Sequence, residues 1–209
     1  MARVDEIELL ETGIKQLNLE CSQAQLEQLL DYKALLIKWN KVYSLTAITK
    51  SLDILTHHLL DGLSIVAHFP NSGALLDVGS GMGVPGIILA IMRPEQAVVV
   101  IDSNAKKCAF LLQAKIELQL SNLQVISQRV EDYQPEQKFQ IITSRAFADL
   151  GLFAQLTSHL LAPDGYYLAM KGEQGEAELT KLTNWQGQVI ELSVPNLAAQ
   201  RFLIKITHK

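Results

Sequence analysis

The sequence predicts a doubly wound α/β domain with a mostly parallel sheet, preceded by a helical N-terminal extension. In the first 70 or so residues, apolar side chains recur at helical spacing. After a turn at Pro70–Gly73, short β-rich runs alternate with helical runs. This alternation is typical of βα units on a parallel sheet covered on both faces. We therefore expect a helical cap at 1–72 and an α/β domain at 73–209.

The N-terminal cap is predicted to contain two main helices. Ser22 followed by Gln25 resembles a capping box, and leucines at helical spacing follow it. A second helical stretch runs from Asp53 to about Phe69, where the turn ends it.

The remaining elements alternate along the α/β domain. The expected strands are 74–78, 97–102, 123–127, 139–144 and 166–170, with two alternating strands near 188–194 and 201–207. The expected helices are 84–93, 105–120, 150–161 and a last one from about 173 to 182.

Composition excludes several classes of protein. The net charge of −4 gives no global basic field for coating nucleic acid, although it does not exclude a local basic patch. Cys21 and Cys108 lie far apart in helical sequence, which favours reduced thiols over a disulfide. The N-terminus has no apolar signal core, and the apolar run 87–92 stops at Arg93, well short of a membrane span. We expect a cytoplasmic protein, with no membrane partner.

Four glycines follow the first predicted strand in the stretch "DVGSGMGVPG" at 77–86. A turn alone needs only one or two glycines, so this backbone is expected to approach a ligand closely. The stretch 81–86 fits the pattern G-x-G-x-x-G, which is weak by itself but gains weight between a strand and a helix. We expect Gly79, Gly81 and Gly83 to be needed for cofactor binding, because a side chain would occupy the ligand's space.

Acidic residues at the strand ends indicate which ligand this is. Asp77 precedes the glycines, where a carboxylate would repel a pyrophosphate and attract a cationic ligand. Asp102 ends the second strand and suits a ribose diol, a feature that NAD enzymes share. Glu131, in "RVEDY", follows the third strand, where it would either read an adenine amino group or only solvate a loop. Together these acids favour S-adenosylmethionine over a dinucleotide.

Several motifs resemble one family. "LLDVGSGMGVPGIILAI", "IDSNAKKCAFL", "RVEDY", "ITSRAFADL" and "YYLAMKG" look like successive motifs of the bacterial ribosomal small subunit methyltransferase G family, also known as glucose-inhibited division protein B. "WNKVYSLTAI" and "HHLLDGLSI" are similar to the family's stretches in the cap. The resemblance runs from about Trp39 to Lys205. Ser44 stands where the family usually has Asn, and Gly62 where it usually has Ser.

The resemblance implies a Rossmann-like fold and the transfer of a methyl group from S-adenosylmethionine to N7 of one guanine in 16S rRNA. The target would lie in the decoding-region loop, helix 18, of the small ribosomal subunit or its assembly intermediate. The cofactor contacts that the family motifs imply are Gly79, Val84, Val130, Glu131 and Arg145.

The chemistry of guanine N7 agrees with the residues present. N7 carries an in-plane lone pair and needs no base to deprotonate it, so alignment can suffice. Neither cysteine lies in a setting for a thiolate nucleophile, and Ser144–Phe147 stands where amino-group methyltransferases carry D/N-P-P-Y/F. His57 and His58 are adjacent and point apart on a helix, so we expect packing or capping and no metal site.

Three basic residues follow or begin predicted strands and match basic positions of the family motifs: Arg145, Lys171 and Arg201. We expect them to align the substrate as a phosphate clamp, with Arg145 also touching the cofactor. The alternative interpretation is that these residues are solvated surface charges or partners of nearby acids. If the clamp is wrong, the cap lysines Lys38, Lys41 and Lys50 would hold the RNA.

Two other functions fit the same sequence. One is a small-molecule methyltransferase, because a fold does not fix a function. The other is a non-enzymatic factor in cell division or ribosome assembly that docks through its cap. We expect the protein to act as a monomer.

Overall fold

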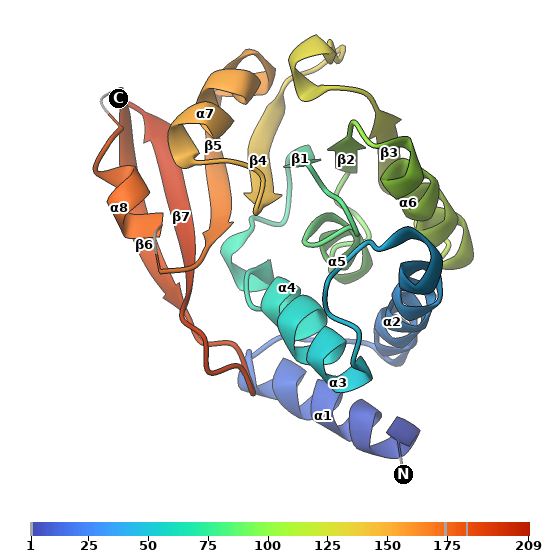
Figure 1. The fold of residues 1–209 in the computed structure, drawn as a ribbon. Coiled ribbons are helices and arrows are strands. Elements are labelled where there is room, and N and C mark those ends of the chain that lie inside the picture. Colours follow the sequence, from blue (N-terminus) through green and yellow to red (C-terminus); the bar gives the residue numbers. More distant parts are fainter. Residues whose placement is uncertain (1, 174, 183) are drawn as a thin grey trace.

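The computed structural model describes residues 2–173, 175–182 and 184–209, and in these residues the strands form one seven-stranded sheet with the order β3-β2-β1-β4-β5-β7-β6 (Figure 1). The strands are β1 (Leu75–Val78), β2 (Val98–Asp102), β3 (Leu123–Ser127), β4 (Phe139–Arg145), β5 (Leu161–Lys171), β6 (Trp185–Leu192) and β7 (Arg201–His208).

The order of the strands reverses between β1 and β4. These two strands pair in parallel, as do the other neighbours among β1–β5, whereas β7 is antiparallel to both β5 and β6. In open sheets of this kind, ligands bind outside the carboxyl ends of the strands at the reversal point. The residues that follow β1, β2 and β4 therefore mark the candidate site.

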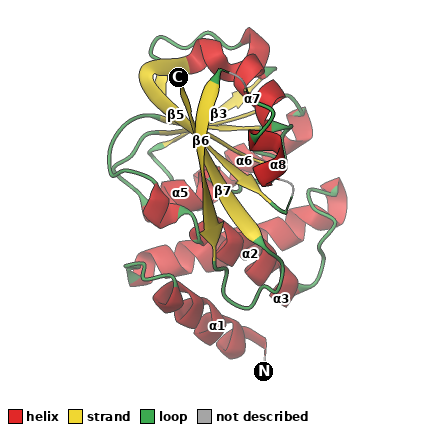
Figure 2. Cartoon of the chain, turned by 90° about the vertical axis from the view of Figure 1, so that its left-hand side faces the viewer, coloured by secondary structure: helices red, strands yellow, loops and turns green. Residues whose placement is uncertain are grey.

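Helices cover both faces of the sheet, and alternate strand residues belong to two apolar clusters. The helices are α1 (Ala2–Gln16), α2 (Gln23–Tyr43), α3 (Ser51–Ile54), α4 (Asp61–Leu63), α5 (Gly86–Met92), α6 (Ala105–Glu117), α7 (Leu150–Thr157) and α8 (Gly175–Leu179). Leu75 and Val100 face the cluster that includes α2, α5 and α6, whereas Leu76 and Ile101 face α7 and α8. Viewed towards the β6 edge, the strands fan out by the usual sheet twist, with α5 on one side and α7 and α8 on the other (Figure 2).

The N-terminal helices form a layer of the same core. Leu29 of α2 and Leu59 belong to one buried cluster with Ile88 of α5. Between α3 and α4 the chain continues as a π-helical stretch, Leu55–Leu60, and a short 3₁₀ helix, Val66–His68, follows α4. The predicted second helix is therefore built from four pieces. The proposed division into 1–72 and 73–209 thus separates two segments that share a core.

Most predicted elements are confirmed. Apart from the divided second helix and from α1, which was not predicted as a separate helix, the differences lie at the ends of the elements. The Ser22–Gln25 capping box is present at the start of α2. α5 begins at Gly86, because the residues before it turn around the glycine loop. β5 begins at Leu161 and takes up the end of the predicted helix 150–161. The expected helix at 173–182 is shorter, Gly175–Leu179, and residue 174 of that prediction lies outside the described residues.

Candidate functional site

The glycine loop follows β1 and adopts the left-handed backbone that glycine allows. Gly79, Gly81 and Gly83 have φ angles of 64°, 59° and 91°. The amides of Gly79 and Ser80 donate to the carbonyl of Ile101, and the Gly81 amide donates to Oδ2 of Asp102 at 2.9 Å. The end of β2 therefore holds the loop in place. A Cβ at Gly81 would meet only the Gly79 carbonyl at 3.7 Å and the Lys107 ammonium at 3.9 Å, so this side of the loop is open.

Asp77 and Gly83 shape this loop from below. Asp77 is fully buried, and its Oδ2 accepts hydrogen bonds from the Ser80 hydroxyl and the Gly86 amide. Burial raises the pKa of Asp77 to about 7. A Cβ at Gly83 would overlap the side chain of Ile87. Asp77 and Gly83 lie next to residues that line the two cavities and help to shape the loop, and their expected role in cofactor binding stays a prediction.

The loop separates two connected cavities. The smaller, about 340 Å³, lies beyond β2 and β3, and the larger, about 510 Å³, lies toward the N-terminal helices. Gly79, Lys107 and Ala146 line both. The site is thus a continuous cleft around the backbone of the glycine loop, suited to an elongated ligand.

The smaller cavity brings together four of the predicted cofactor residues: Gly79, Asp102, Val130 and Glu131. Asp102 is 8% exposed and offers carboxylate oxygens, whereas Val130 and Phe147 supply apolar surface. Glu131 is paired with Arg129 at 2.7 Å, and the hydrogen bond from Arg129 lowers the pKa of this glutamate. A hydroxyl-bearing ring with an apolar face, such as a nucleoside, matches this set of groups.

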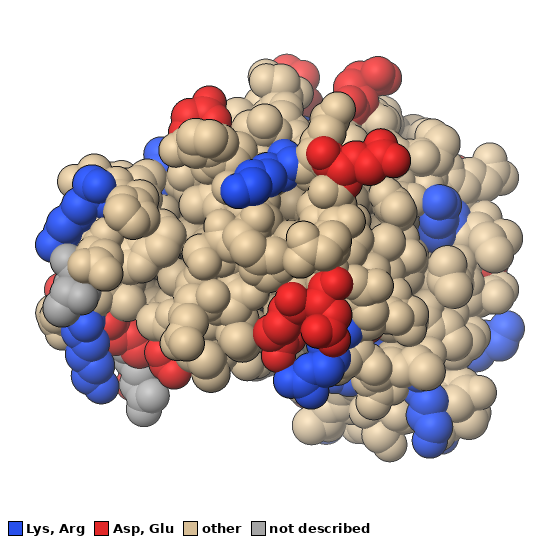
Figure 3. Space-filling view, turned by 90° about the horizontal axis from the view of Figure 1, so that it is seen from above, with Lys and Arg blue, Asp and Glu red and all other residues tan. Residues whose placement is uncertain are grey.

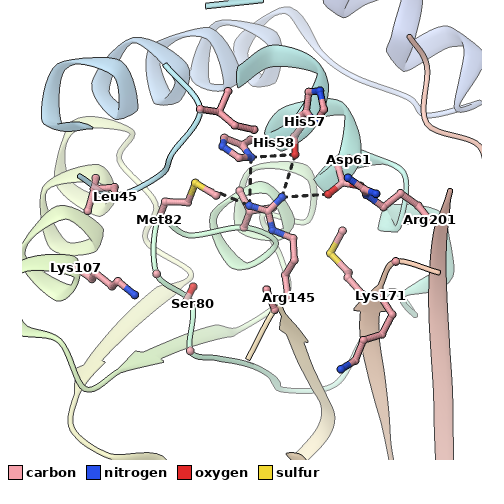
Figure 4. A pocket seen from close by; sticks show the side chains of 17 residues that line it. Leu45, His57, His58, Asp61, Ser80, Met82, Lys107, Arg145, Lys171 and Arg201 are labelled. Atoms are coloured by element: carbon pink, nitrogen blue, oxygen red, sulfur yellow. Dashed lines mark hydrogen bonds and ion pairs between the residues drawn. The ribbon is translucent and has the colours of Figure 1, made fainter. Parts of the chain in front are cut away.

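The larger cavity is basic, and its lining includes Val84 and all three predicted basic residues, Arg145, Lys171 and Arg201. Arg145 extends from the end of β4 toward the N-terminal helices (Figure 4). Its Nη1 donates to the carbonyl of His57 at 3.0 Å and to Oδ2 of Asp61 at 3.1 Å. Its Nη2 lies 3.9 Å from the sulfur of Met82 in the glycine loop. Arg145 therefore spans the cavity from the sheet to the cap.

Asp61 joins Arg145 to Arg201. This carboxylate is 2% exposed, and its Oδ1 accepts a hydrogen bond from Nε of Arg201 at 3.1 Å. Lys171 differs from the two arginines, because its ammonium bonds the Ala148 carbonyl and pairs with Glu178 at 2.8 Å. Figure 4 shows its side chain directed away from the arginine pair. The structure thus brings Arg145 and Arg201 together and places Lys171 on the cavity wall with its charge already paired.

His58 supports the arginine from the cap side. Burial, together with the nearby charge of Arg145, lowers the pKa of His58 to about 4, so the ring is neutral near pH 7. Its Nε2 lies 2.9 Å from the Thr46 hydroxyl, and its Nδ1 lies 3.3 Å from Nη2 of Arg145. The expectation of a packing role for this histidine agrees with its burial.

Sequence reasoning missed Asp61 and Tyr32. Asp61 lies in the stretch "HHLLDGLSI", which carried the family resemblance but gave no role to the carboxylate. Tyr32 is buried in α2 and donates its hydroxyl to the Met82 carbonyl at 2.6 Å, which ties the cap to the glycine loop. The signal that could have found Asp61 is a charged residue between the leucines Leu59, Leu60 and Leu63.

The described residues offer neither a metal site nor a membrane span. In 2–173, 175–182 and 184–209, no cluster of His, Cys, Asp and Glu could hold a metal ion. No helix in the same part of the chain is long and apolar enough to cross a membrane.

Comparison with known proteins places this cleft in a family. Residues 25–204 match the rRNA small subunit methyltransferase G family. The chain belongs to this family. It is 52% identical over 195 residues to the ribosomal RNA small subunit methyltransferase G of Methylobacillus flagellatus, covering 93% of this chain and 95% of the relative. The corresponding protein of Chromobacterium violaceum is 49% identical, with coverage of 94% and 95%.

Solved structures show the same fold at low sequence identity. A complex of DhpI with SAH has a TM-score of 0.59 and 16% identity, and covers 90% of this chain and 98% of its own. A protein of Methanococcus maripaludis, described as an S-adenosyl-L-methionine-dependent methyltransferase, also has a TM-score of 0.59, with 15% identity and coverage of 85% and 92%. The predicted Rossmann-like methyltransferase fold and the resemblance to the methyltransferase G family are therefore confirmed.

Proposed function

We propose that this protein binds S-adenosylmethionine in the cleft around the glycine loop and methylates N7 of one guanine of 16S rRNA, in the decoding-region loop of the small subunit. The observation that carries the proposal is the basic cavity beside that loop in a chain of the methyltransferase G family. This activity would place the protein where ribosomes are assembled, in the cytoplasm.

The residues of the cleft fit the cofactor. Asp102 offers an acceptor to a ribose diol, and the apolar side chains of the smaller cavity suit an adenine ring. The open side of Gly81 leaves room for a ligand in the larger cavity, and Gly79, Lys107 and Ala146, which line both cavities, adjoin both halves of an elongated ligand. When bound, S-adenosylmethionine supplies an electrophilic methyl carbon on a sulfonium.

The larger cavity fits the acceptor base. Transfer to guanine N7 would use the lone pair of the base, with the sulfonium sulfur as leaving group, so no group on the protein would have to take a proton. The protein contributes alignment, which can be worth about 7–11 kcal/mol. Arg145 and Arg201 offer guanidinium groups to the RNA phosphates, which would leave the N7 lone pair free.

The distribution of charge outside the cleft supports RNA recognition at a local site. The face of the molecule in Figure 3 carries Lys and Arg side chains mixed with Asp and Glu, separated by uncharged surface. RNA contact is therefore expected around the cleft, where the basic side chains converge.

The test is to map 7-methylguanosine in 16S rRNA. Small subunits from cells that lack the gene are incubated with purified protein and S-adenosylmethionine, and the rRNA is digested and analysed by mass spectrometry. One new 7-methylguanosine in the decoding-region loop is expected, matching the position modified in cells that carry the gene. Methyl transfer to small molecules without transfer to rRNA would overturn the proposal.

A further inference from the structure

The segment 38–52 forms one wall of the larger cavity and continues onto the outer surface. It comprises the end of α2, the loop after it and the first residues of α3. Leu45 and Ile48 of its loop line the cavity, and Figure 4 shows Leu45 on that wall. A ligand that leaves the cavity on this side would therefore run along the segment.

The outward side of this segment is basic. It contains Lys38, Lys41 and Lys50 but no Asp or Glu, although the whole chain has a net charge of −4. All three lysines are exposed, and none forms an ion pair with the part of the chain that the structure describes. Glu6 contacts the segment at Ser51, but its carboxylate is already engaged with that hydroxyl and with Lys33.

The same segment exposes apolar side chains. Of the six large apolar residues that are exposed in the described chain, three lie here: Val42, Tyr43 and Leu52. The Tyr43 ring is 42% exposed and packs on Trp39, with ring centroids 5.1 Å apart. A supported, partly exposed aromatic ring between lysines is a platform on which a nucleic-acid base can stack.

Hydrogen bonds hold the loop of the segment. Ser44 caps α2 in the left-handed conformation, and the Asn40 side chain accepts from the Thr46 amide at 2.8 Å. The Thr46 hydroxyl accepts from the Ile48 amide and contacts His58, which adjoins Arg145. The outer surface and the cavity are thus connected through a fixed backbone, so binding at one can position a strand in the other.

We propose that segment 38–52 is a docking surface for the RNA strand next to the methylated guanine, with its lysines on phosphates and Tyr43 stacked on a base. This inference rests on the proposed function and adds the surface that holds the substrate outside the cavity. An RNA strand is favoured over a protein because the segment pairs unneutralised positive charge with an aromatic face.

The test compares two triple variants. Lys38→Ala with Lys41→Ala and Lys50→Ala removes the charges of the segment. Lys15→Ala with Lys138→Ala and Lys181→Ala is the matched control, because these three lysines are exposed and line neither cavity. Binding to a 16S rRNA transcript is measured across salt concentrations, cofactor binding by calorimetry, and folding by thermal melting.

The segment variant should bind the transcript more weakly. Each lost phosphate contact flattens the slope of log affinity against log salt concentration by ~0.7, so three lost contacts flatten it by about two units, whereas the control keeps the wild-type slope. Its cofactor affinity and melting temperature should stay unchanged, and its KM for small subunits should rise. Tyr43→Ala should weaken transcript binding about fivefold or more. Tyr43→Phe, which keeps an aromatic ring, should bind as tightly as wild type.

Equal slopes and affinities for the segment variant and wild type would overturn the docking surface. A raised KM for small subunits together with normal transcript binding would also overturn it, and would indicate that the segment contacts a ribosomal protein. Binding is measured independently of methylation. If wild-type protein binds the transcript through these lysines but transfers no methyl group, the proposed function is contradicted and the docking surface is not.

Discussion

The Asp61 carboxylate accepts a hydrogen bond from Arg145 at 3.1 Å, although the two residues lie 84 positions apart in the chain. Asp61 also holds Arg201, so one buried acid fixes the geometry of two cations from different strands. In Asp61→Asn the shape is kept but the charge is lost, which leaves two guanidinium groups without their counter-charge. We expect single-turnover methylation of subunits to fall at least about tenfold.

RNA binding separates this effect from simple unfolding. Asp61→Asn removes one negative charge from the cavity, so its affinity for the 16S rRNA transcript should stay equal or rise while the methylation rate falls. Asp31→Asn on the exposed face of α2 is the control for a lost carboxylate. A variant that methylates at the wild-type rate would show that Asp61 does not position the arginines.

Substitutions of the loop glycines should separate cofactor binding from folding. Gly81→Ala makes only ordinary van der Waals contacts, so the expected stability loss is that of a left-handed alanine, about 1–2 kcal/mol, with cofactor binding strongly reduced. Gly83→Ala also overlaps Ile87 and should lose a further ~1–3 kcal/mol. Gly172→Ala, with nothing near its Cβ and an ordinary φ, is the control for stability.

Urea unfolding and calorimetry with S-adenosylmethionine measure the two effects. If Gly81→Ala binds the cofactor as tightly as wild type, the loop does not approach the ligand at this residue. Equal stability of the Gly81 and Gly83 variants would contradict the packing role assigned to Gly83.

The sequence was sufficient to predict the succession of strands and helices along the α/β domain, because the spacing of apolar residues and the turn residues act locally. The glycine loop and the strand-end residues Asp102 and Arg145 were also found, since parallel strands bring their carboxyl ends to one edge. The neighbours of each side chain could not be predicted. Asp77 has the residue type of a ligand contact, but its burial under the loop depends on packing that no local pattern encodes. The pairing of Lys171 with Glu178 likewise depends on where α8 packs.

Arg201 and Lys171 are expected to differ in their effect on methylation. Arg201→Ala removes a group of the arginine pair that faces the cavity, so methylation and the salt slope of RNA binding should both fall, with cofactor affinity nearly unchanged. Lys171→Ala breaks a pair with Glu178 and a bond to Ala148, so a loss of stability should accompany its effect on methylation.

The comparison is made on small subunits across salt concentrations, together with thermal melting. Glu178→Gln, which breaks the same pair from the other side, is the matched variant for Lys171→Ala. If both alanine variants methylate normally at every salt concentration, neither residue belongs to a phosphate clamp.

Asp77 should make the stability of the fold depend on pH near neutrality. Burial raises its pKa in the folded protein from 3.8 to about 7, so the folded state holds this proton more tightly than the unfolded chain. Its contribution to stability is therefore fully present below about pH 4 and is lost as pH rises through about 7. Asp77→Asn has no such proton, and its amide oxygen can still accept from Ser80 and Gly86. Urea unfolding at pH 5.5 and 8.5 should show the variant gaining stability relative to wild type at the higher pH, and a difference that does not change with pH would contradict the raised pKa of Asp77.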